Sequence, residues 1–136
     1  VHLVAAPAYL AEHGTPAAPQ DLAQYQAILP SYTDVSALTL QGRGESHNIE
    51  LQAAIHSNNT QMLYQLVCAG AGIGYLPEWL LRADLQTGRL RCLLPDYRTA
   101  PVPFYAVYTQ RKLLSAKVRS FIDFMVEKAA NEQAGL

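Results

Sequence analysis

With 136 residues, the chain is long enough for one domain with a hydrophobic core, or for one lobe of a larger domain. Hydrophobic residues make up 50% of it and charged residues 15%, which excludes a disordered chain. The net charge of −1 comes without a basic run, so this segment is not expected to bind DNA itself, and no apolar run is long enough to span a membrane.

The first half of the chain alternates between short strands and short helices. The apolar runs predict strands at residues 3–6, 27–29, 37–40 and 49–55, and the prolines at 7 and 19 predict the starts of two helices. Within residues 49–55 the apolar side chains alternate with polar or small ones. This pattern predicts one continuous strand that carries four residues on one face: Ile49, Leu51, Ala53 and Ile55.

The second half repeats the alternation. A helix is predicted from about Thr60, with Asn58 and Gln61 as its capping box, and a strand follows at residues 73–76. Pro77 opens another helix, which is followed by strands at 90–94 and 104–108 and by a final helix. Strands that alternate with helices predict an α/β fold with a largely parallel or mixed sheet flanked by helices.

The final helix shows the clearest helical period in the chain. Its apolar positions fall on one broad face: Leu114, Val118, Phe121, Ile122, Met125 and Ala129. The rest of the chain offers few elements to cover this face. We therefore expect it to pack on a part of a longer protein or on a second copy of the chain, which predicts a homo-oligomer.

The residue types that carry catalysis or bind cofactors show no convergent pattern. The glycines at 70, 72 and 74 follow a helix and open a strand, which is the reverse of a dinucleotide-binding loop, so we interpret them as a helix stop and a close approach. Neither cysteine has an evident base partner, and the histidines do not converge on a metal site. We predict no cofactor, no metal and no enzymatic activity, and two free, buried thiols in a reducing cytoplasm.

A polar cluster stands where a strand passes into a helix: Ser57, Asn58, Asn59 and Thr60. The first N–H groups of a helix have no partner within the helix and carry partial positive charge, so such a junction can hold a small anion. Polar residues before a helix are also ordinary caps, worth about 1 kcal/mol. On local evidence the cap is the simpler interpretation.

The whole chain resembles the effector-binding domain of LysR-type transcriptional regulators. The segments that carry the resemblance are LVAAPAYLAEHGTPAAPQDL, LVCAGAGIGYLPEWL, DLQTGRLRCLLPDYRTAPVPFYAVY and LSAKVRSFIDFM, in this order over nearly the full length. The resemblance implies a fold like that of type 2 periplasmic binding proteins, in which two α/β lobes are joined by two crossing strands. Residues 1–6 would then be the first crossover strand and 7–100 the complete second lobe. Residues 101–136 would form the returning crossover and the C-terminal helix of the first lobe.

The resemblance also implies a function and a site. The chain would be a C-terminal fragment of a cytoplasmic regulator that binds a small, anionic metabolite between its lobes, and an N-terminal helix-turn-helix outside the chain would bind DNA. The effector contacts of the family fall on Ser57, Asn58, Asn59 and Thr60, and Phe104 would line the floor of the cleft. Two alternatives stay open, because one fold supports many functions. They are a lobe of a solute-binding protein for transport and a small α/β enzyme domain.

Overall fold

The computed structural model describes residues 1–32, 34–100, 105, 107 and 115–134. The chain divides into two compact units, Val1–Val102 and Pro103–Leu136. The strand predicted at 104–108 falls largely outside the described residues, as does Phe104.

The first unit is built on a mixed sheet of five strands, here called sheet A. The strands follow one another across the sheet in the order β5, β2, β6, β1, β7. Their bounds are Gln52–Ser57 for β5, Gln26–Pro30 for β2, Ile73–Leu76 for β6, His2–Ala5 for β1 and Arg91–Cys92 for β7. Strands β5, β2 and β6 are parallel, whereas β1 runs antiparallel to both β6 and β7. The mixed sheet is the one predicted.

The central strands of sheet A, β2, β6 and β1, are buried on both faces, and neighbouring residues of one strand enter different cores. On β2, Ile28 belongs to one cluster of buried side chains, while Ala27 and Leu29 belong to the other. On β1, Val4 and Leu3 are divided in the same way. This is the two-residue period of a strand, and burial on both faces explains why β1 and β2 read as short apolar runs, whereas the edge strands β5 and β7 do not.

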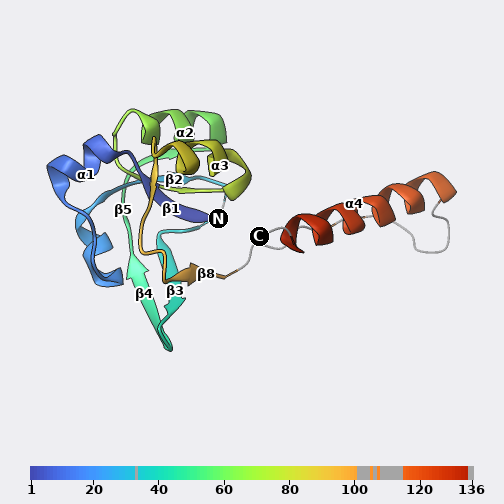
Figure 1. Ribbon diagram of the computed structural model, residues 1–136, viewed down its shortest axis with the longest axis horizontal. Coiled ribbons are helices and arrows are strands. Elements are labelled where there is room, and N and C mark those ends of the chain that lie inside the picture. The colour runs from blue at the N-terminus through green and yellow to red at the C-terminus, as the bar shows by residue number, and fades with distance from the viewer. Residues whose placement is uncertain (33, 101–104, 106, 108–114, 135–136) are drawn as a thin grey trace. The chain divides into compact units, whose positions relative to one another are not determined.

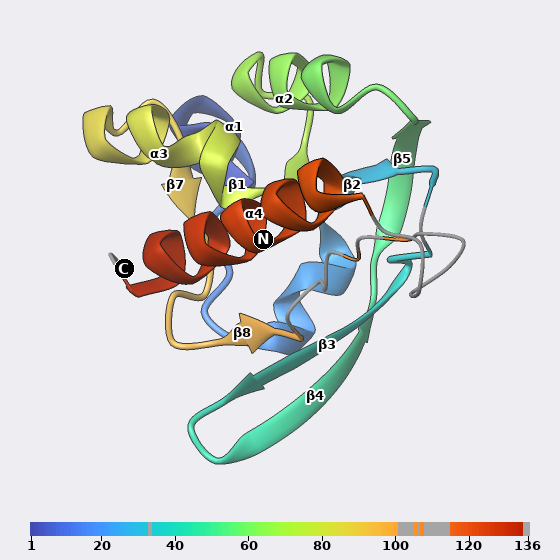
Figure 2. The ribbon, with the colours of Figure 1, turned by 90° about the vertical axis from the view of Figure 1, so that its right-hand side faces the viewer.

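Two helices cover one face of sheet A. Helix α2 spans Thr60–Cys68 and contributes Leu63 and Val67 to the core, and α3 spans Glu78–Thr87 and contributes Leu81. Both lie on the same side of the strands in Figures 1 and 2. Helix α1, Pro7–His13, and the 3₁₀-helix η1, Pro19–Gln24, supply Tyr9, Leu10 and Leu22 to the core on the other face.

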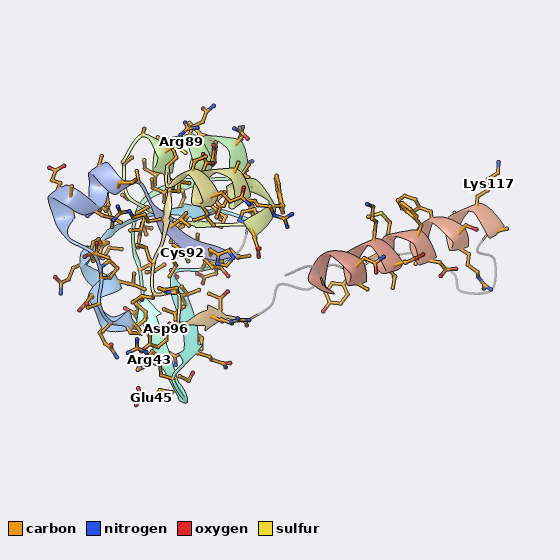
Figure 3. All side chains as sticks on the ribbon, viewed as in Figure 1. Arg43, Glu45, Arg89, Cys92, Asp96 and Lys117 are labelled. Carbon is orange, nitrogen blue, oxygen red and sulfur yellow. The ribbon has the colours of Figure 1, made fainter. Side chains whose placement is uncertain are left out.

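A second, antiparallel sheet extends from the first as a long hairpin (Figure 2). It consists of β3, Ala37–Gly42, β4, Glu45–Glu50, and the short β8, Arg98–Thr99. In the turn between β3 and β4, Arg43 forms an ion pair with Asp96, and both are labelled in Figure 3.

The prediction of one continuous strand at 49–55 was wrong. The chain leaves the second sheet after Glu50 and enters sheet A at Gln52, because β4 pairs with β3 whereas β5 pairs with β2. The N–H group of Leu51, between the two strands, donates a hydrogen bond to the carbonyl of Ser36 at 2.8 Å. A change of pairing partner breaks the alternation, so Ala53 is exposed although Ile49 and Leu51 are buried.

The glycine pattern is confirmed as structural. Gly70 follows α2 with a φ of 78°, in the left-handed region that favours glycine. A Cβ atom on Gly72 would stand 2.4 Å from the carbonyl oxygen of Gln26, and one on Gly74 would stand 2.4 Å from Val67 Cγ2. These two glycines therefore let β6 approach β2 and α2 closely.

The strand predicted at 90–94 is shorter than expected. Strand β7 ends at Cys92, and Leu94 has a φ of 49°, a left-handed conformation outside the range of a regular strand. The chain turns there, and the N–H group of Tyr97 donates to the carbonyl of Leu94 at 2.9 Å.

In the second unit, the described residues form one helix, α4, Ala116–Ala134. The predicted helix is therefore confirmed. Its large apolar side chains are exposed, with Phe121 at 62% and Met125 at 50% of full exposure. Nothing among the described residues of its own unit covers them, and Leu114 lies outside those residues.

Candidate functional site

The carboxyl ends of the three parallel strands form one edge of sheet A, here called the carboxyl edge. It carries the ends of β2, β5 and β6 at Pro30, Ser57 and Leu76, together with the start of β1, because His2 pairs with Leu76. In open α/β sheets ligands bind at such an edge, where the loops leave the strands. The fold thus places the Ser57–Thr60 corner, the segment predicted to contact an effector, at the expected edge.

Within the Ser57–Thr60 corner, two side chains are engaged in local hydrogen bonds. Ser57 Oγ accepts a hydrogen bond from the N–H group of Asn59 at 3.1 Å and donates one to Met62 Sδ at 3.6 Å. Asn59 Oδ1 accepts a hydrogen bond from the N–H group of Met62 at 3.1 Å. These bonds fix the entry of the chain into α2 and leave Ser57 and Asn59 less free to bind a ligand.

The prediction of a capping box from Asn58 to Gln61 was wrong by one residue. Helix α2 has its N-cap at Asn59, which has extended dihedral angles of −104° and 101°, and its cap bond goes to Met62. Met62 has no carboxylate or amide with which to return the bond, so the reciprocal half of a capping box is missing. Asn58 is consequently free of the cap: its side chain is exposed and makes no hydrogen bond to the described residues.

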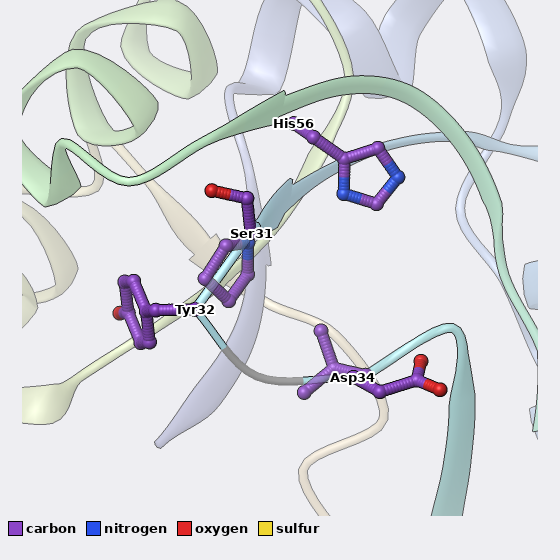
Figure 4. A pocket seen from close by; sticks show the side chains of 6 residues that line it. Ser31, Tyr32, Asp34 and His56 are labelled. Atoms are coloured by element: carbon purple, nitrogen blue, oxygen red, sulfur yellow. The ribbon is translucent and has the colours of Figure 1, made fainter.

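A cavity of about 330 Å³ opens beside this corner. It is lined by six residues from the end of β2, from the chain that follows it and from β5: Pro30, Ser31, Tyr32, Asp34, Val35 and His56. Figure 4 shows His56 facing the segment that carries Ser31, Tyr32 and Asp34. The N–H group of Ser31 donates to the carbonyl of Ser57 at 3.0 Å, and Tyr32 Oη lies 3.5 Å from Thr60 Oγ1, so cavity and corner are directly joined.

The sequence analysis missed residues 30–32, 34 and 35 as part of the site. A signal was present, because Pro30 ends a strand that was predicted to lie in a parallel or mixed sheet, and neighbouring parallel strands end at a common edge. What the sequence lacked was the strand order, which makes β2 the neighbour of β5.

The cavity carries a negative charge at Asp34, which disfavours an anion beside that residue. Asp34 accepts hydrogen bonds from the hydroxyl of Ser36 at 2.6 Å and from its N–H group at 3.1 Å. These bonds, assisted by His56, hold the pKa of the Asp34 carboxyl below its ordinary value, so it is ionised at neutral pH. The six lining residues include this carboxylate and neither lysine nor arginine.

At the far end of the same edge the structure corrects another prediction. Cys92, which was expected to lack a base partner, has its Sγ atom 3.9 Å from Nδ1 of His2. The other ring nitrogen of His2, Nε2, lies 3.2 Å from Oε2 of Glu78. Both cysteines are free, as predicted, but each is only partly buried.

Metal-ligating residues do not gather elsewhere in the part of the chain that the structure describes. No group of three histidine, cysteine, aspartate or glutamate side chains there is arranged to hold a metal ion. His47 lies on β4 against Tyr97, whereas His56 lies on β5 in sheet A, so the two histidines nearest in sequence belong to different sheets.

Comparison with known proteins identifies the family. The model of the LysR substrate binding domain family matches residues 1–130. The chain belongs to this family. It is 32% identical over 138 residues to the HTH-type transcriptional regulator CrgA of Neisseria meningitidis, covering 98% of this chain and 45% of that protein. It is 33% identical to the regulator PtxR of Pseudomonas aeruginosa, covering 95% of this chain and 42% of PtxR.

Solved structures agree with this assignment. The full-length virulence activator AphB of Vibrio cholerae matches with a TM-score of 0.77 at 27% identity, over 93% of this chain and 44% of AphB. The CrgA regulatory domain matches with a TM-score of 0.71 at 26% identity, over 93% of this chain and 63% of that domain. The fold is therefore that of the effector-binding domain of LysR-type regulators, the periplasmic-binding-protein-like fold predicted from the sequence.

The chain spans less than half the length of the curated relatives that it matches. Those relatives are transcriptional regulators by name. Among the described residues, none of the helices has the length and apolar character needed to cross a bilayer.

Proposed function

We propose that this LysR-type domain senses a small-molecule effector at the carboxyl edge of sheet A, where the Ser57–Thr60 corner meets the cavity lined by residues 30–32, 34, 35 and 56. The observation that supports the proposal most is the direct contact of corner and cavity through Ser31 and Tyr32. A cavity of about 330 Å³ lies in the range of small-ligand sites. The side chains of Asn58 and Thr60, with the first N–H groups of α2, would supply its polar contacts.

The effector is proposed to carry an anionic group that lies against Asn58 and Thr60 at the N-terminus of α2. This position uses the partial positive charge of the helix end. It also separates the anion from Asp34, whose carboxylate would attract a hydrogen-bond donor at the other side of the cavity. Phe104, which the sequence analysis added to the site, lies outside the described residues and stays a prediction.

Regulation would follow from a change in the equilibrium between arrangements of two lobes. We assign residues 7–100 to the second lobe and residues 1–6 and 101–136 to the crossovers and the terminal helix, as the family resemblance implies. An effector that binds one arrangement better than another shifts the population toward it. DNA binding is assigned to a part of the regulator outside this chain, and the site of action to the cytoplasm. No catalytic role is proposed.

The exposed apolar face of α4 supports a further part of the proposal. Phe121, Phe124 and Met125 are each at least half exposed, and such a face needs a cover in water. We propose that another part of the regulator or a second copy covers it. Light scattering after size exclusion is expected to show association of the 136-residue chain, and a monomer at high concentration would contradict the second-copy interpretation.

The effector site can be tested with a pair of substitutions in the intact regulator. Asn58→Ala combined with Thr60→Ala is expected to weaken effector binding about tenfold or more, because two polar contacts are lost, without unfolding the protein. The probes are a panel of small carboxylates and their neutral amides, with binding read as the rise in thermal unfolding temperature. Ser46→Ala, on the exposed strand β4, serves as the matched control.

The outcomes separate the two parts of the proposal. Unchanged binding by the double variant would leave Asn58 and Thr60 without a ligand role and would contradict the site. Equal binding of carboxylates and amides, with loss in the double variant, would keep the site and contradict the anionic group.

A further inference from the structure

Three side chains from distant parts of the sequence meet at the end of the carboxyl edge opposite the Ser57–Thr60 corner. They are His2 of β1, Glu78 of α3 and Cys92 of β7, and we call them the thiol cluster. Strand pairing explains the meeting. His2 pairs with Leu76, so the chain that leaves β6 brings Glu78 beside it. Val4 pairs with Cys92, and residues two apart on a strand share a face, so Cys92 and His2 lie on the same side of sheet A.

The geometry assigns different roles to the two nitrogens of the His2 ring. Nε2 lies 3.2 Å from Oε2 of Glu78, and an ionised carboxylate can only accept a hydrogen bond. Nε2 therefore carries the proton in neutral His2. This leaves Nδ1 without a proton, 3.9 Å from Cys92 Sγ, where it can take the thiol proton that Sγ otherwise donates to the carbonyl oxygen of Leu93 at 3.8 Å. The thiol cluster thus contains a nucleophile, a base beside it and a third group that orients the base.

Other roles for the thiol cluster fit the observations less well. A metal ion needs its ligands around one point, but the sulfur and the carboxylate lie on opposite nitrogens of the ring, and no metal-binding group of three was found among the described residues. A disulfide is excluded within this structure because Cys68 and Cys92 are both free. The cluster is also accessible, since the side chains of His2 and Glu78 are 36% and 34% exposed and Cys92 is partly buried.

We propose that Cys92 is a nucleophilic thiol that adds to electron-poor alkenes, the class of α,β-unsaturated carbonyl compounds. His2 Nδ1 takes the thiol proton while the sulfur forms a bond to the β-carbon of the alkene. The electron pair of the double bond moves toward the carbonyl, and the α-carbon then receives the proton from His2. Nothing is oxidised or reduced and no group leaves. Glu78 stabilises the imidazolium that forms during the step.

Burial of Cys92 makes the base essential to this proposal. Burial raises the pKa of the Cys92 thiol, so the thiol alone would be mostly protonated at neutral pH and slow to react. A reactive Cys92 would therefore depend on His2, and this dependence distinguishes the proposal from ordinary exposure of a thiol. It also predicts a difference from Cys68, which was not found beside a histidine among the described residues.

The test compares the two thiols of the same chain, with N-ethylmaleimide as the probe. Cys68→Ala leaves only Cys92 to react, and Cys92→Ala leaves only Cys68. The rate of adduct formation at neutral pH is measured by mass spectrometry of the intact chain. Cys92 is expected to react at least about tenfold faster than Cys68, since general-base assistance is typically worth this much or more.

Substitutions of the base and of its carboxylate partner complete the test in the Cys68→Ala background. His2→Gln is expected to lower the rate about tenfold or more, and Glu78→Gln to lower it several-fold. His13→Gln, at an exposed histidine on α1, is the matched control and is expected to leave the rate unchanged. Unaltered thermal unfolding temperatures show that each variant is folded, and Glu78→Gln tests the proposal even if His2→Gln unfolds. A Cys92 that reacts no faster than Cys68, or a rate that neither substitution changes, would overturn the proposal.

Discussion

The Ser57–Thr60 corner and the thiol cluster stand at opposite ends of one edge of sheet A, yet they are assembled in different ways. Four strand spacings separate β5 from β7, or ~19 Å at about 4.8 Å each. Within the corner, the side chains of Ser57 and Asn59 make hydrogen bonds that span two to five residues of the sequence, such as the bond from Met62 to Asn59. The thiol cluster joins residues that are 76 and 90 positions apart. Local side-chain bonds shape the entry into α2 in the first group, whereas strand pairing and the start of α3 bring the members of the second together.

Helices α2 and α3 connect the two ends, because the corner leads into α2 and Glu78 begins α3. The two helices are joined by a hydrogen bond from Tyr64 Oη to Asp84 Oδ2 at 2.8 Å. Asp84 is 7% exposed and also lies 3.5 Å from Arg89 Nη1. The comparison therefore predicts that some substitutions act on the common scaffold and others on one end only.

The largest effect is expected from the scaffold. Leu63→Ala should lower the free energy of unfolding by about 2–5 kcal/mol, because Leu63 is 1% exposed and its removal leaves a cavity between α2 and sheet A. Urea denaturation of the 136-residue chain measures the change. Gln61→Ala, at an exposed neighbouring residue, is the control. If Leu63→Ala lost no more free energy of unfolding than Gln61→Ala, Leu63 would not be the anchor of α2.

A smaller effect is expected from the bond between the helices. Tyr64→Phe should cost about 1–2 kcal/mol, because the buried carboxylate of Asp84 loses a hydrogen-bond donor. Urea denaturation at neutral pH again gives the value. Equal stability of the variant and the original chain would show that Arg89 alone satisfies Asp84.

The same bond predicts a dependence of stability on pH. The hydrogen bond to Asp84, followed by burial, raises the pKa of Tyr64 from 10.0 to about 12. Folding thus favours the protonated phenol, so this contribution is complete below pH 10.0 and is lost as the pH rises through about 12. Unfolding curves of the original chain should lose stability across this interval, and those of Tyr64→Phe should lose less. Parallel curves would contradict the prediction.

The smallest effects separate cap from ligand contact within the corner. Asn59→Ala should cost about 1 kcal/mol through loss of the cap bond to Met62. Asn58→Ala should change stability by no more than about 0.5 kcal/mol, because its side chain is exposed and makes no bond to the described residues. Thermal unfolding of both variants checks the pair. A larger loss of stability in Asn58→Ala than in Asn59→Ala would show that Asn58 is the N-cap.

Most single elements could be predicted because their signals are local. The helix at Thr60, its stop at a glycine and the strand at 73–76 follow from apolar period, turn chemistry and glycine within a few residues, and the structure places the stop at Gly70. The errors lie where the pairing partner of a strand decides where that strand begins and ends. Residues 49–55 form an alternating run, but the run divides between two sheets at Leu51. The cap was predicted at Asn58 but lies at Asn59. Both residues carry the same amide side chain, and only the backbone dihedral angles decide which of them caps the helix.

The sequence by itself indicated the family, through segments that resemble LysR-type effector-binding domains. It also determined the α/β class and the polar corner before α2, since these depend on composition, period and neighbouring residues. The tertiary structure alone decided which residues share the carboxyl edge: the cavity residues 30–32, 34 and 35 beside the corner, and His2 beside Cys92. The physical reason is that strand order and register bring together residues distant along the chain. No spacing within the sequence records that β2 neighbours β5 or that β7 pairs with β1.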